Sequence, residues 1–473
     1  MKVVRIIARL NVGGPAKHVA WLTAATRRAG VESELVAGTV PPGEDDMSYF
    51  AAAQGVEPII VAEMSREVSP KDALTVWKLY RLFRRLQPDI VHTHTAKAGT
   101  VGRVAGVLYR WLTPAALAGR PRPCRFVHTY HGHIFHSYYG RLKTLVFLTV
   151  ERVLARTATD RIVVISRQQF REIHEQFGVG RARQFRVIPL GLDVEAFAGW
   201  RARREAARAA LGAKEDELLV GIVGRLTEIK NHKLFLEVAA LYLERDAAAQ
   251  ATGEVGETFG AAASRRVRFV VVGDGHLREA LQTQADALGI GERVTFTGLR
   301  DDPENFYAAL DIVALTSLNE GTPLTLIEAM ANARPVVATA VGGVVDLLGE
   351  ASDDEPAAHA TAPAHAYTIC ERGVRVGTND AEAFCAALRR LITDEELRRT
   401  LGERGRAFVA EHYSKERLVA DVLNLYSELL PSQTSPTAER VSSHARGKGA
   451  ATAKTAAKQG SVPGIETARL KGD

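Results

Sequence analysis

Glu320 and Glu328 are two carboxylates whose spacing suits the recognition of hydroxyl groups on either side of an anion. Glu320 precedes an expected helix, and Glu328 lies inside that helix, about 7–8 Å further along its axis. Because carboxylates repel phosphate, both side chains are expected to accept hydrogen bonds from hydroxyls that flank it. Two glutamates at this spacing are also common on solvated helices, so the spacing alone leaves both interpretations open.

The start of this helix is a candidate phosphate site. The apolar run 311–317 predicts a strand, Thr322 is expected as the N-cap, and the helix is predicted to continue from Pro323 to Ala333. The free amides and partial positive charge at a helix start favour a phosphate. Sugar, diphosphate and ribose in line, the layout of a nucleotide-sugar, would match both glutamates. The residues expected to contact the diphosphate are Gly321, Thr322, Pro323 and Leu324.

Arg225 and Lys230 supply positive charge at another expected strand end. The run 218–226 predicts a strand, and residues 227–232 lead from it into a helix. The two cations lie five residues apart across this loop, which allows both to converge on one diphosphate. Without further context, such a pair would be an ordinary surface feature.

Three neighbouring segments together resemble the donor-site signature of the retaining glycosyltransferases of family 4, whose fold type is GT-B. They are residues 319–331, 334–339 and 341–346. The similarity runs from about residue 3 to residue 430. The resemblance implies that Glu320 contacts the donor sugar and that Glu328 contacts the ribose hydroxyls.

Further segments extend the resemblance. Residues 224–231 resemble the donor-phosphate motif of the family, which implies that Arg225 and Lys230 bind the diphosphate. The family places the nucleobase against backbone near the position of Leu299, so side chains encode the identity of the base poorly. Residues 188–193 resemble an interdomain motif, but Leu190 replaces its usual asparagine.

Gly13 and Gly14 precede a helix predicted for residues 15–29 and form a second turn that is compatible with phosphate. The turn is not G-x-G-x-x-G, and no acidic residue ends the next strand at residues 33–38, which disfavours a dinucleotide. In the similar family this turn faces the diphosphate and the acceptor. Gly14 is therefore expected to contact the donor and Gly13 the acceptor.

His92 and His94 lie on one face of a strand predicted for residues 89–94, at the carboxyl end, where open α/β sheets bind ligands. They are expected to line an acceptor pocket, with Lys97 and Arg103 holding an acceptor phosphate. The alternative for the two cations is a solvated helix start. A metal pair would need a third ligand, which is not apparent nearby, and no suitable D-x-D motif occurs. No metal and no cofactor are expected.

His131 follows a strand predicted for residues 125–130. The similar family carries a histidine at this strand end, near the anomeric carbon of the donor, which implies a catalytic role for His131. A purely structural role is the alternative, more so for His128 and His133. The expected catalytic set is His131, Glu320, Arg225 and Lys230.

Alternating strand and helix patterns over 473 residues predict an α/β fold with two domains. The resemblance implies two Rossmann-like doubly wound domains of the GT-B type, facing each other across a cleft that holds the active site. The expected parts are an acceptor domain at 1–195, a donor domain at 196–412, a helix crossing back at 413–430, a disordered basic tail at 431–473, and insertions at 247–266 and 351–366.

Charge is distributed unevenly along the chain. Residues 1–195 hold 28 Lys and Arg against 16 Asp and Glu, whereas residues 196–430 hold 26 against 36. A basic half predicts an anionic partner, such as a membrane face or a phosphorylated acceptor. The 7% aromatic content and the lack of a recognisable module make nucleic acid the least favoured partner.

The rest of the composition is that of an ordinary soluble globular protein. Three cysteines far apart in sequence give no disulfide framework, and neither a signal peptide nor a membrane span is recognisable. We therefore expect a cytoplasmic protein, peripheral at the inner face of the cell membrane. The resemblance implies a retaining, metal-independent hexosyltransferase (EC 2.4.-.-) that acts on a polyprenyl-linked or other glycan acceptor in surface polysaccharide assembly. The alternatives are a GT-B-like nucleotide-sugar epimerase and a non-catalytic scaffold that binds nucleotide-sugar or membrane.

Overall fold

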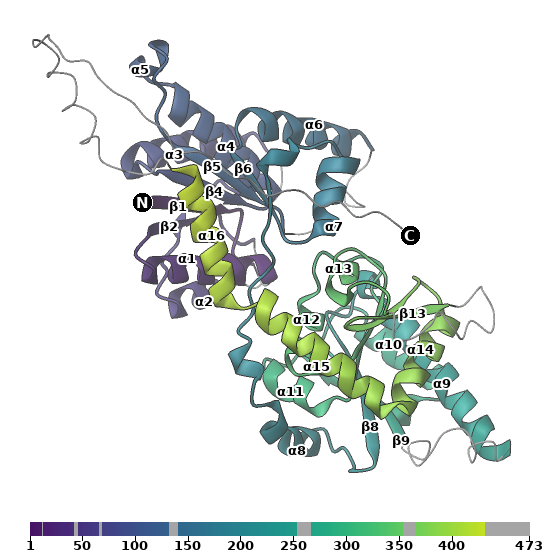
Figure 1. Ribbon diagram of the computed structural model, residues 1–473. Helices are drawn as coiled ribbons and strands as arrows, with labels where there is room; N and C mark the ends of the chain where they lie inside the picture. The colour runs from purple at the N-terminus through teal and green to yellow at the C-terminus, as the bar shows by residue number, and fades with distance from the viewer. Residues whose placement is uncertain are drawn as a thin grey trace, which may run out of the picture. The chain divides into compact units, whose positions relative to one another are not determined.

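Strands and helices alternate along the chain in the computed structural model of the protein, and they build two mostly parallel sheets that are covered by helices (Figure 1). The structure describes residues 1–430, except residue 12 and residues 42–45, 66–68, 132–140, 253–265 and 353–365; the side chains of residues 141–143 are also not described. Residues 1–430 form one compact unit. The α/β prediction is confirmed.

The first sheet has seven strands in the order β3-β2-β1-β4-β5-β6-β7, all parallel. Both of its faces are covered, which is why strands such as β1 read as nearly continuous apolar runs. Its strands are β1 (Lys2–Ile7), β2 (Glu32–Ala37), β3 (Ile59–Ile60), β4 (Ile90–His94), β5 (Arg125–Thr129), β6 (Arg161–Val164) and β7 (Phe185–Val187). The helices of this part are α1 (Gly14–Arg28), α2 (Ser48–Ala53), α3 (Lys71–Leu86), α4 (Ala96–Trp111), α5 (Pro114–Leu117), α6 (Arg141–Thr157) and α7 (Arg167–Phe170).

The second sheet also has seven strands, in the order β10-β9-β8-β11-β12-β14-β13, and only the edge strand β13 is antiparallel. Its strands are β8 (Glu217–Val223), β9 (Arg266–Val272), β10 (Val294–Gly298), β11 (Ile312–Leu315), β12 (Val336–Thr339), β13 (Tyr367–Cys370) and β14 (Gly373–Val376). The helices that follow or flank them are α8 (Trp200–Ala210), α9 (His232–Thr252), α10 (Arg278–Ala287), α11 (Pro303–Ala309), α12 (Leu324–Ala331), α13 (Val344–Leu348), α14 (Ala381–Thr393) and α15 (Glu395–His412).

The last described helix, α16 (Lys415–Leu429), packs on the first sheet although it follows the second in sequence. Its buried face, which includes Val422 and Tyr426, joins one apolar cluster with Val3 and Ile90 of strands β1 and β4. Residues of α16 therefore contribute to the core around the first sheet.

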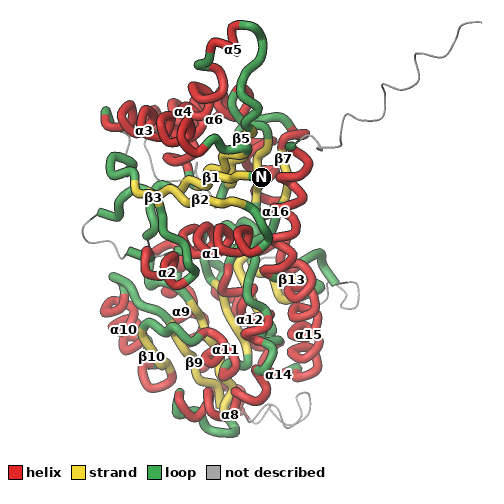
Figure 2. The backbone as a smooth tube through the Cα atoms, turned by 90° about the vertical axis from the view of Figure 1, so that its left-hand side faces the viewer, coloured by secondary structure: helices red, strands yellow, loops and turns green. Residues whose placement is uncertain are grey.

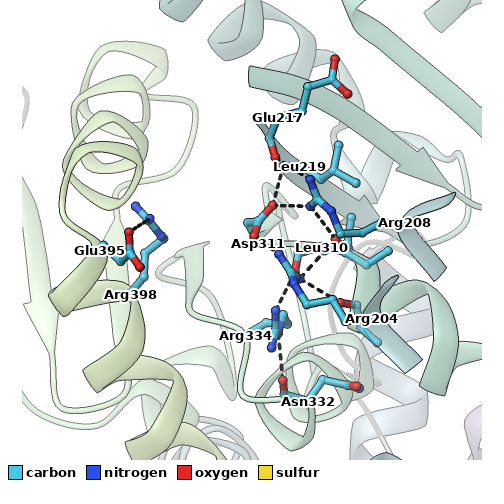
Figure 3. Close-up of polar contacts among 12 residues, drawn as sticks. Arg204, Arg208, Glu217, Leu219, Leu310, Asp311, Asn332, Arg334, Glu395 and Arg398 are labelled. Atoms are coloured by element: carbon cyan, nitrogen blue, oxygen red, sulfur yellow. Dashed lines mark hydrogen bonds and ion pairs between the residues drawn. The ribbon is translucent and has the colours of Figure 1, made fainter. Parts of the chain in front are cut away.

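Asp311 anchors the amino end of β11, the strand whose other end carries the Glu320 loop. The Asp311 carboxylate is paired with Arg204 and Arg208 of α8, and it accepts a hydrogen bond of 2.8 Å from the Leu219 amide of β8 (Figure 3). Arg334, whose pKa burial lowers to about 9, stacks 3.9 Å from the Trp200 ring. This network fixes β11 against β8 and α8.

The first predicted insertion is shorter than the range 247–266. Helix α9 continues to Thr252 and β9 begins at Arg266, so residues 247–252 are helical. Residues 253–265, most of the second insertion, the tail 431–473 and the residue His133 lie outside the described part of the chain. No helix in the described part is long and apolar enough to cross a bilayer.

Candidate functional site

The helix after β11 begins one residue later than predicted. Helix α12 starts at Leu324, and Pro323 takes the N-cap position with an extended backbone (φ −73°, ψ 108°), so the prediction of Thr322 as N-cap is wrong. Because the ψ of Pro323 is extended rather than helical, Pro323 is not the first helical residue, and Thr322 stays in the loop before it. The helix also ends at Ala331, because Asn332 caps it and Ala333 has a left-handed φ of 55°.

Lys230 and Glu320 meet at the carboxyl ends of two adjacent central strands, β8 and β11. The Lys230 Nζ lies 2.5 Å from Glu320 Oε1, and the Ser317 hydroxyl donates to the same oxygen at 2.6 Å. The backbones are also tied, since Thr316 Oγ1 donates to the Asn231 carbonyl at 2.9 Å. The sequence predicted both residues as site residues, and the structure brings them together.

Gly343 supports the loop that carries Glu320. Its amide donates to the Gly321 carbonyl at 2.7 Å, and a Cβ at this position would stand 2.2 Å from that oxygen, so only glycine fits. The hydroxyls of Thr322 and Thr325 are buried and have no hydrogen-bond partner among the described residues. Two unsatisfied donors beside the start of α12 suit an anionic or hydroxyl-rich ligand.

Glu328 is partly buried within α12. Burial raises the pKa of its carboxyl to about 7, although the Tyr307 hydroxyl partly offsets this effect. The Tyr307 side chain is fully buried, and burial together with the Glu328 carboxylate raises the pKa of its hydroxyl well above the usual range. Glu328 can therefore change protonation near neutral pH when a ligand reaches it.

Arg225 and Leu299 lie at strand ends, and their side chains form no hydrogen bond or ion pair with the described residues of the Glu320 loop. Arg225 is exposed and forms no ion pair with a described residue, so its approach to a diphosphate stays a prediction. Leu299 follows Gly298 at the end of β10 and is 82% exposed.

Gly13 and Gly14 form the start of α1 in the first part of the chain. Gly13 holds the N-cap position with an extended backbone, and no side chain caps the helix. The first amides of α1 are therefore open to an anion, as expected for this turn. Their assignment to donor and acceptor stays a prediction.

His94 and His131, at the ends of β4 and β5, form a cluster with His18 of α1. His94 Nδ1 and His131 Nε2 are hydrogen-bonded at 2.8 Å, and the rings of His18 and His131 meet edge to face at 5.0 Å. Burial lowers the pKa of His131 to about 4 and those of His18 and His94 well below the usual value, so all three imidazoles are neutral.

The sequence pointed to His92 and His94 as the only possible metal pair, whereas the group with metal-ligand spacing among the described residues leaves out His92 and consists of His18, His94 and His131. One ligand atom from each of His18, His94 and His131 lies within 4.8 Å of the other two. Sequence reasoning missed His18 because it lies on a helix and its partners lie on strands; its place one turn after Gly14 was the only signal. Two nitrogens on one tetrahedral zinc ion stand about 3.3 Å apart, so a metal would have to replace the His94–His131 hydrogen bond.

His92 does not line a pocket, which corrects the prediction. The side chain is 1% exposed, and its two ring nitrogens contact the Tyr426 hydroxyl at 2.6 Å and Thr129 Oγ1 at 2.7 Å. Tyr426 comes from α16 and also accepts from Arg5 Nη2 at 3.2 Å. Tyr426 of α16 and Thr129 of β5 therefore satisfy both ring nitrogens of His92.

Lys97 and Arg103 do not offer a surface for an acceptor phosphate, so this prediction is also wrong. Lys97 is 9% exposed and is paired with Asp72 of α3. Arg103 is fully buried, 2.5 Å from Glu151 of α6, which is equally buried. Both cations lie on the faces of α4 that pack against neighbouring helices, where they serve the fold.

Comparison with known proteins matches both halves of the chain. The family model "Glycosyltransferase Family 4" matches residues 12–196, and "Glycosyl transferases group 1" matches residues 203–408. The chain is similar to the Escherichia coli UDP-Gal:alpha-D-GlcNAc-diphosphoundecaprenol alpha-1,3-galactosyltransferase, with 28% identity over 378 residues, which cover 79% of this chain and 84% of that protein. It is 31% identical over 355 residues to the D-inositol 3-phosphate glycosyltransferase of Salinispora tropica, covering 72% of this chain and 64% of the relative.

The fold is that of solved proteins with low sequence identity. The crystal structure of Anabaena HepE in complex with UDP aligns with a TM-score of 0.68 at 19% identity, over 90% of this chain and 100% of HepE. At this identity the likeness shows the fold alone, and it agrees with the two parallel sheets described above.

Proposed function

We propose that this protein transfers a hexose from a nucleotide diphosphate to a hydroxyl of a lipid-linked glycan and retains the anomeric configuration. The premise is that the chain belongs to glycosyltransferase family 4 and has the GT-B fold. The single observation that carries the proposal is the meeting of Lys230 and Glu320 beside the start of α12.

Charge accounts for the role of this site. Cleavage of the sugar–phosphate bond places additional negative charge on the departing diphosphate. Lys230, Arg225 and the amides at the start of α12 would stabilise that charge more in the transition state than in the ground state. The buried, unpartnered hydroxyls of Thr322 and Thr325 add two donors at the same helix start.

The proposed step is a same-face displacement. The bond between the anomeric carbon and the diphosphate oxygen breaks while the acceptor oxygen forms its bond from the side of the leaving group. The acceptor proton passes to an oxygen of the departing diphosphate. Glu320 and His131 would position the sugar, and the neutral state of His131 at pH 7 suits hydrogen bonding to hydroxyls.

The donor is proposed to be a uridine diphosphate sugar. The name of the Escherichia coli relative specifies UDP-Gal, and HepE was solved with UDP. Glu328 would accept hydrogen bonds from the ribose hydroxyls. We propose that no metal takes part, since Lys230 and Arg225 would neutralise the phosphate charge.

The acceptor is proposed to be a polyprenyl-diphosphate-linked glycan, and the protein to act peripherally at the inner face of the cell membrane in surface polysaccharide assembly. The Escherichia coli relative is named for a diphosphoundecaprenol-linked substrate. The 28 Lys and Arg against 16 Asp and Glu in residues 1–195 favour an anionic partner.

A two-stage experiment tests the proposal. Thermal shifts with uridine, guanosine and adenosine diphosphate sugars should show the largest stabilisation with a uridine donor. Transfer to a synthetic N-acetylglucosamine-diphospholipid, followed by NMR of the product, should show retained configuration. Donor conversion without acceptor would identify an epimerase, binding without conversion would identify a scaffold, and an inverted product would overturn the retaining step.

A further inference from the structure

Exposed apolar side chains are concentrated on one group of helices. Of the 17 large hydrophobic residues exposed in the described part of the chain, nine lie between the start of α3 and the end of α6. Helix α3 packs beside α4, and α4 beside α6, in a layer on one side of the first sheet (Figures 1 and 2). We call the outward side of this layer, with the α5 projection, the helical face.

Helix α3 presents an amphipathic stripe to the outside of this layer. Leu74 is 45% exposed and Trp77 is 52% exposed, while residues such as Leu79 and Phe83 on the opposite side are buried. The same outward stripe continues with Arg81, Arg84 and Arg85, at helical spacing from Trp77. These three arginines form no ion pair with any described residue, so their charge is available to a partner.

The end of α4 and the short helix α5 form a projection that stands away from the sheet, at the top of Figures 1 and 2. Trp111 and Leu112 are 52% and 59% exposed, and Leu117 of α5 is 94% exposed. Much of the apolar surface of this tryptophan and these leucines is therefore left uncovered by the described residues. Tryptophan is the side chain that favours the boundary between water and lipid.

The unpaired charge near the projection is positive. Residues 90–150 contain no Asp or Glu and hold eight Lys and Arg, of which Lys97, Arg103, Arg110 and Arg125 are paired with carboxylates of other segments. Arg120, at the tip, is exposed and forms no ion pair with a described residue. Residues 431–473 hold 7 Lys and Arg against 3 Asp and Glu, so neither this tail nor a second copy of the helical face offers the opposite charge. Exposed apolar side chains with Arg120 and the three α3 arginines on the same group of helices instead fit a surface that is anionic outside and apolar beneath.

We propose that the helical face docks on an anionic lipid bilayer, with Trp77, Trp111 and Leu117 entering the headgroup boundary and the α3 arginines contacting lipid phosphates. The inference deepens the proposed function, on which it rests, because a lipid-linked acceptor keeps its reactive sugar at the bilayer surface. It names the surface that would hold the enzyme there.

Vesicle co-sedimentation of the full chain tests the proposal. The protein should bind vesicles of phosphatidylcholine with about 30% phosphatidylglycerol at low salt, and binding should fall at least about tenfold on vesicles of phosphatidylcholine alone or at ~0.5 M salt. Equal binding to both vesicles, or none to either, would overturn it.

Matched variants locate the surface. Trp111→Ser with Leu117→Ser, and separately Arg81→Glu with Arg84→Glu, should each weaken vesicle binding about tenfold or more. Tyr49→Ser removes an aromatic side chain of α2 that is 67% exposed, and it should bind as the unaltered chain does. All are surface changes, so equal melting temperatures will show that folding is preserved. If the Trp111 and Leu117 variant binds normally, or loses only self-association in light scattering, the helical face is not the lipid contact.

Transfer to a short-chain, water-soluble acceptor analogue separates this inference from the proposed function. The helical-face variants should keep that activity while losing activity on acceptor embedded in vesicles. Vesicle binding without transfer to either acceptor would leave docking supported and overturn the transferase. Transfer to both acceptors without vesicle binding would overturn docking alone.

Discussion

The Lys230 ammonium lies 2.5 Å from the Glu320 carboxylate and joins the turn after β8 to the loop before α12. The pair offsets the negative charge of Glu320 where a diphosphate is proposed to bind, which lowers the repulsion between carboxylate and phosphate. An ammonium has three donors, so Lys230 can keep Glu320 in place and still contact a phosphate oxygen. Lys230 thus links sugar positioning to leaving-group stabilisation.

Lys230→Ala should lower kcat/KM for transfer by about 10²–10³-fold, because it removes charge that is needed most in the transition state. Initial-rate assays with saturating acceptor will measure the loss. Lys233→Ala, a change of an exposed lysine three residues later on α9, is the matched control and should retain full activity. Near-normal turnover by Lys230→Ala would contradict the proposed diphosphate site.

Nucleotide affinity should depend on the protonation of Glu328, whose pKa burial raises to about 7. If the ribose hydroxyls need the ionised carboxylate, affinity for UDP should rise by up to about tenfold between about pH 6 and pH 8. Calorimetric titration will measure this change. Glu328→Gln should bind more weakly at pH 8 and lose the pH dependence, and an unchanged affinity at pH 8 would argue against the ribose role.

The same carboxyl should affect stability with the opposite trend. Its pKa is raised in the folded protein, so the folded state holds a proton that the unfolded state has lost between about pH 4.5 and pH 7. Its contribution to the free energy of unfolding should therefore decrease as pH rises through this window. The melting temperature of Glu328→Gln should therefore fall less between about pH 4.5 and pH 7 than that of the unaltered chain. Equal falls in melting temperature would contradict this assignment.

The loop that carries Glu320 could be predicted from the sequence because the residues that define it lie close together in the chain. The run 311–317, Gly321 and Pro323 define a strand, a loop and a helix within a few residues, and Glu320 and Lys230 both fall at strand ends of one parallel sheet. The alternation of short apolar runs with helices predicts the parallel sheets. The one-residue error at Thr322 arose because a proline is typical of the first helical position, whereas the extended backbone of Pro323 makes it the N-cap.

The predictions for the acceptor-binding residues were wrong because the burial of polar residues depends on distant parts of the chain. His92 is covered by Tyr426, which lies 334 residues away. Arg103 is neutralised by Glu151 of another helix, and nothing in the spacing of α4 distinguishes a buried arginine from a solvated one. His18 joined the histidine cluster through helix packing, which the pattern of β4 does not encode.

Arg103 and Glu151 give a stability prediction. Arg103→Leu should cost about 3–5 kcal/mol, because it leaves the Glu151 carboxylate buried without its cation. The double variant Arg103→Leu with Glu151→Leu should recover much of the loss, although the Tyr130 hydroxyl would then lack its acceptor. Denaturant unfolding will measure both. Arg399→Leu, which removes an exposed arginine paired with Glu396, should have a far smaller effect, because solvent screens this pair. Equal losses at the two sites would contradict the role of burial.

Removal of metal should leave transfer unchanged, even though His18, His94 and His131 have the composition of a zinc site. Burial is the main cause of the lowered pKa of His18 and His94, and the positive charge of the buried Arg5 guanidinium contributes to it; the same charge opposes a divalent cation. The His94–His131 hydrogen bond would also have to be given up. Purified protein treated with a chelator should therefore keep its rate, and elemental analysis should find far less than one transition metal ion per chain. His18→Ala provides the check, since it removes one potential ligand and leaves the other two in place. If the chelator lowers the rate and His18→Ala lowers the metal content together, the cluster is a metal centre and the proposed metal-independent step is wrong.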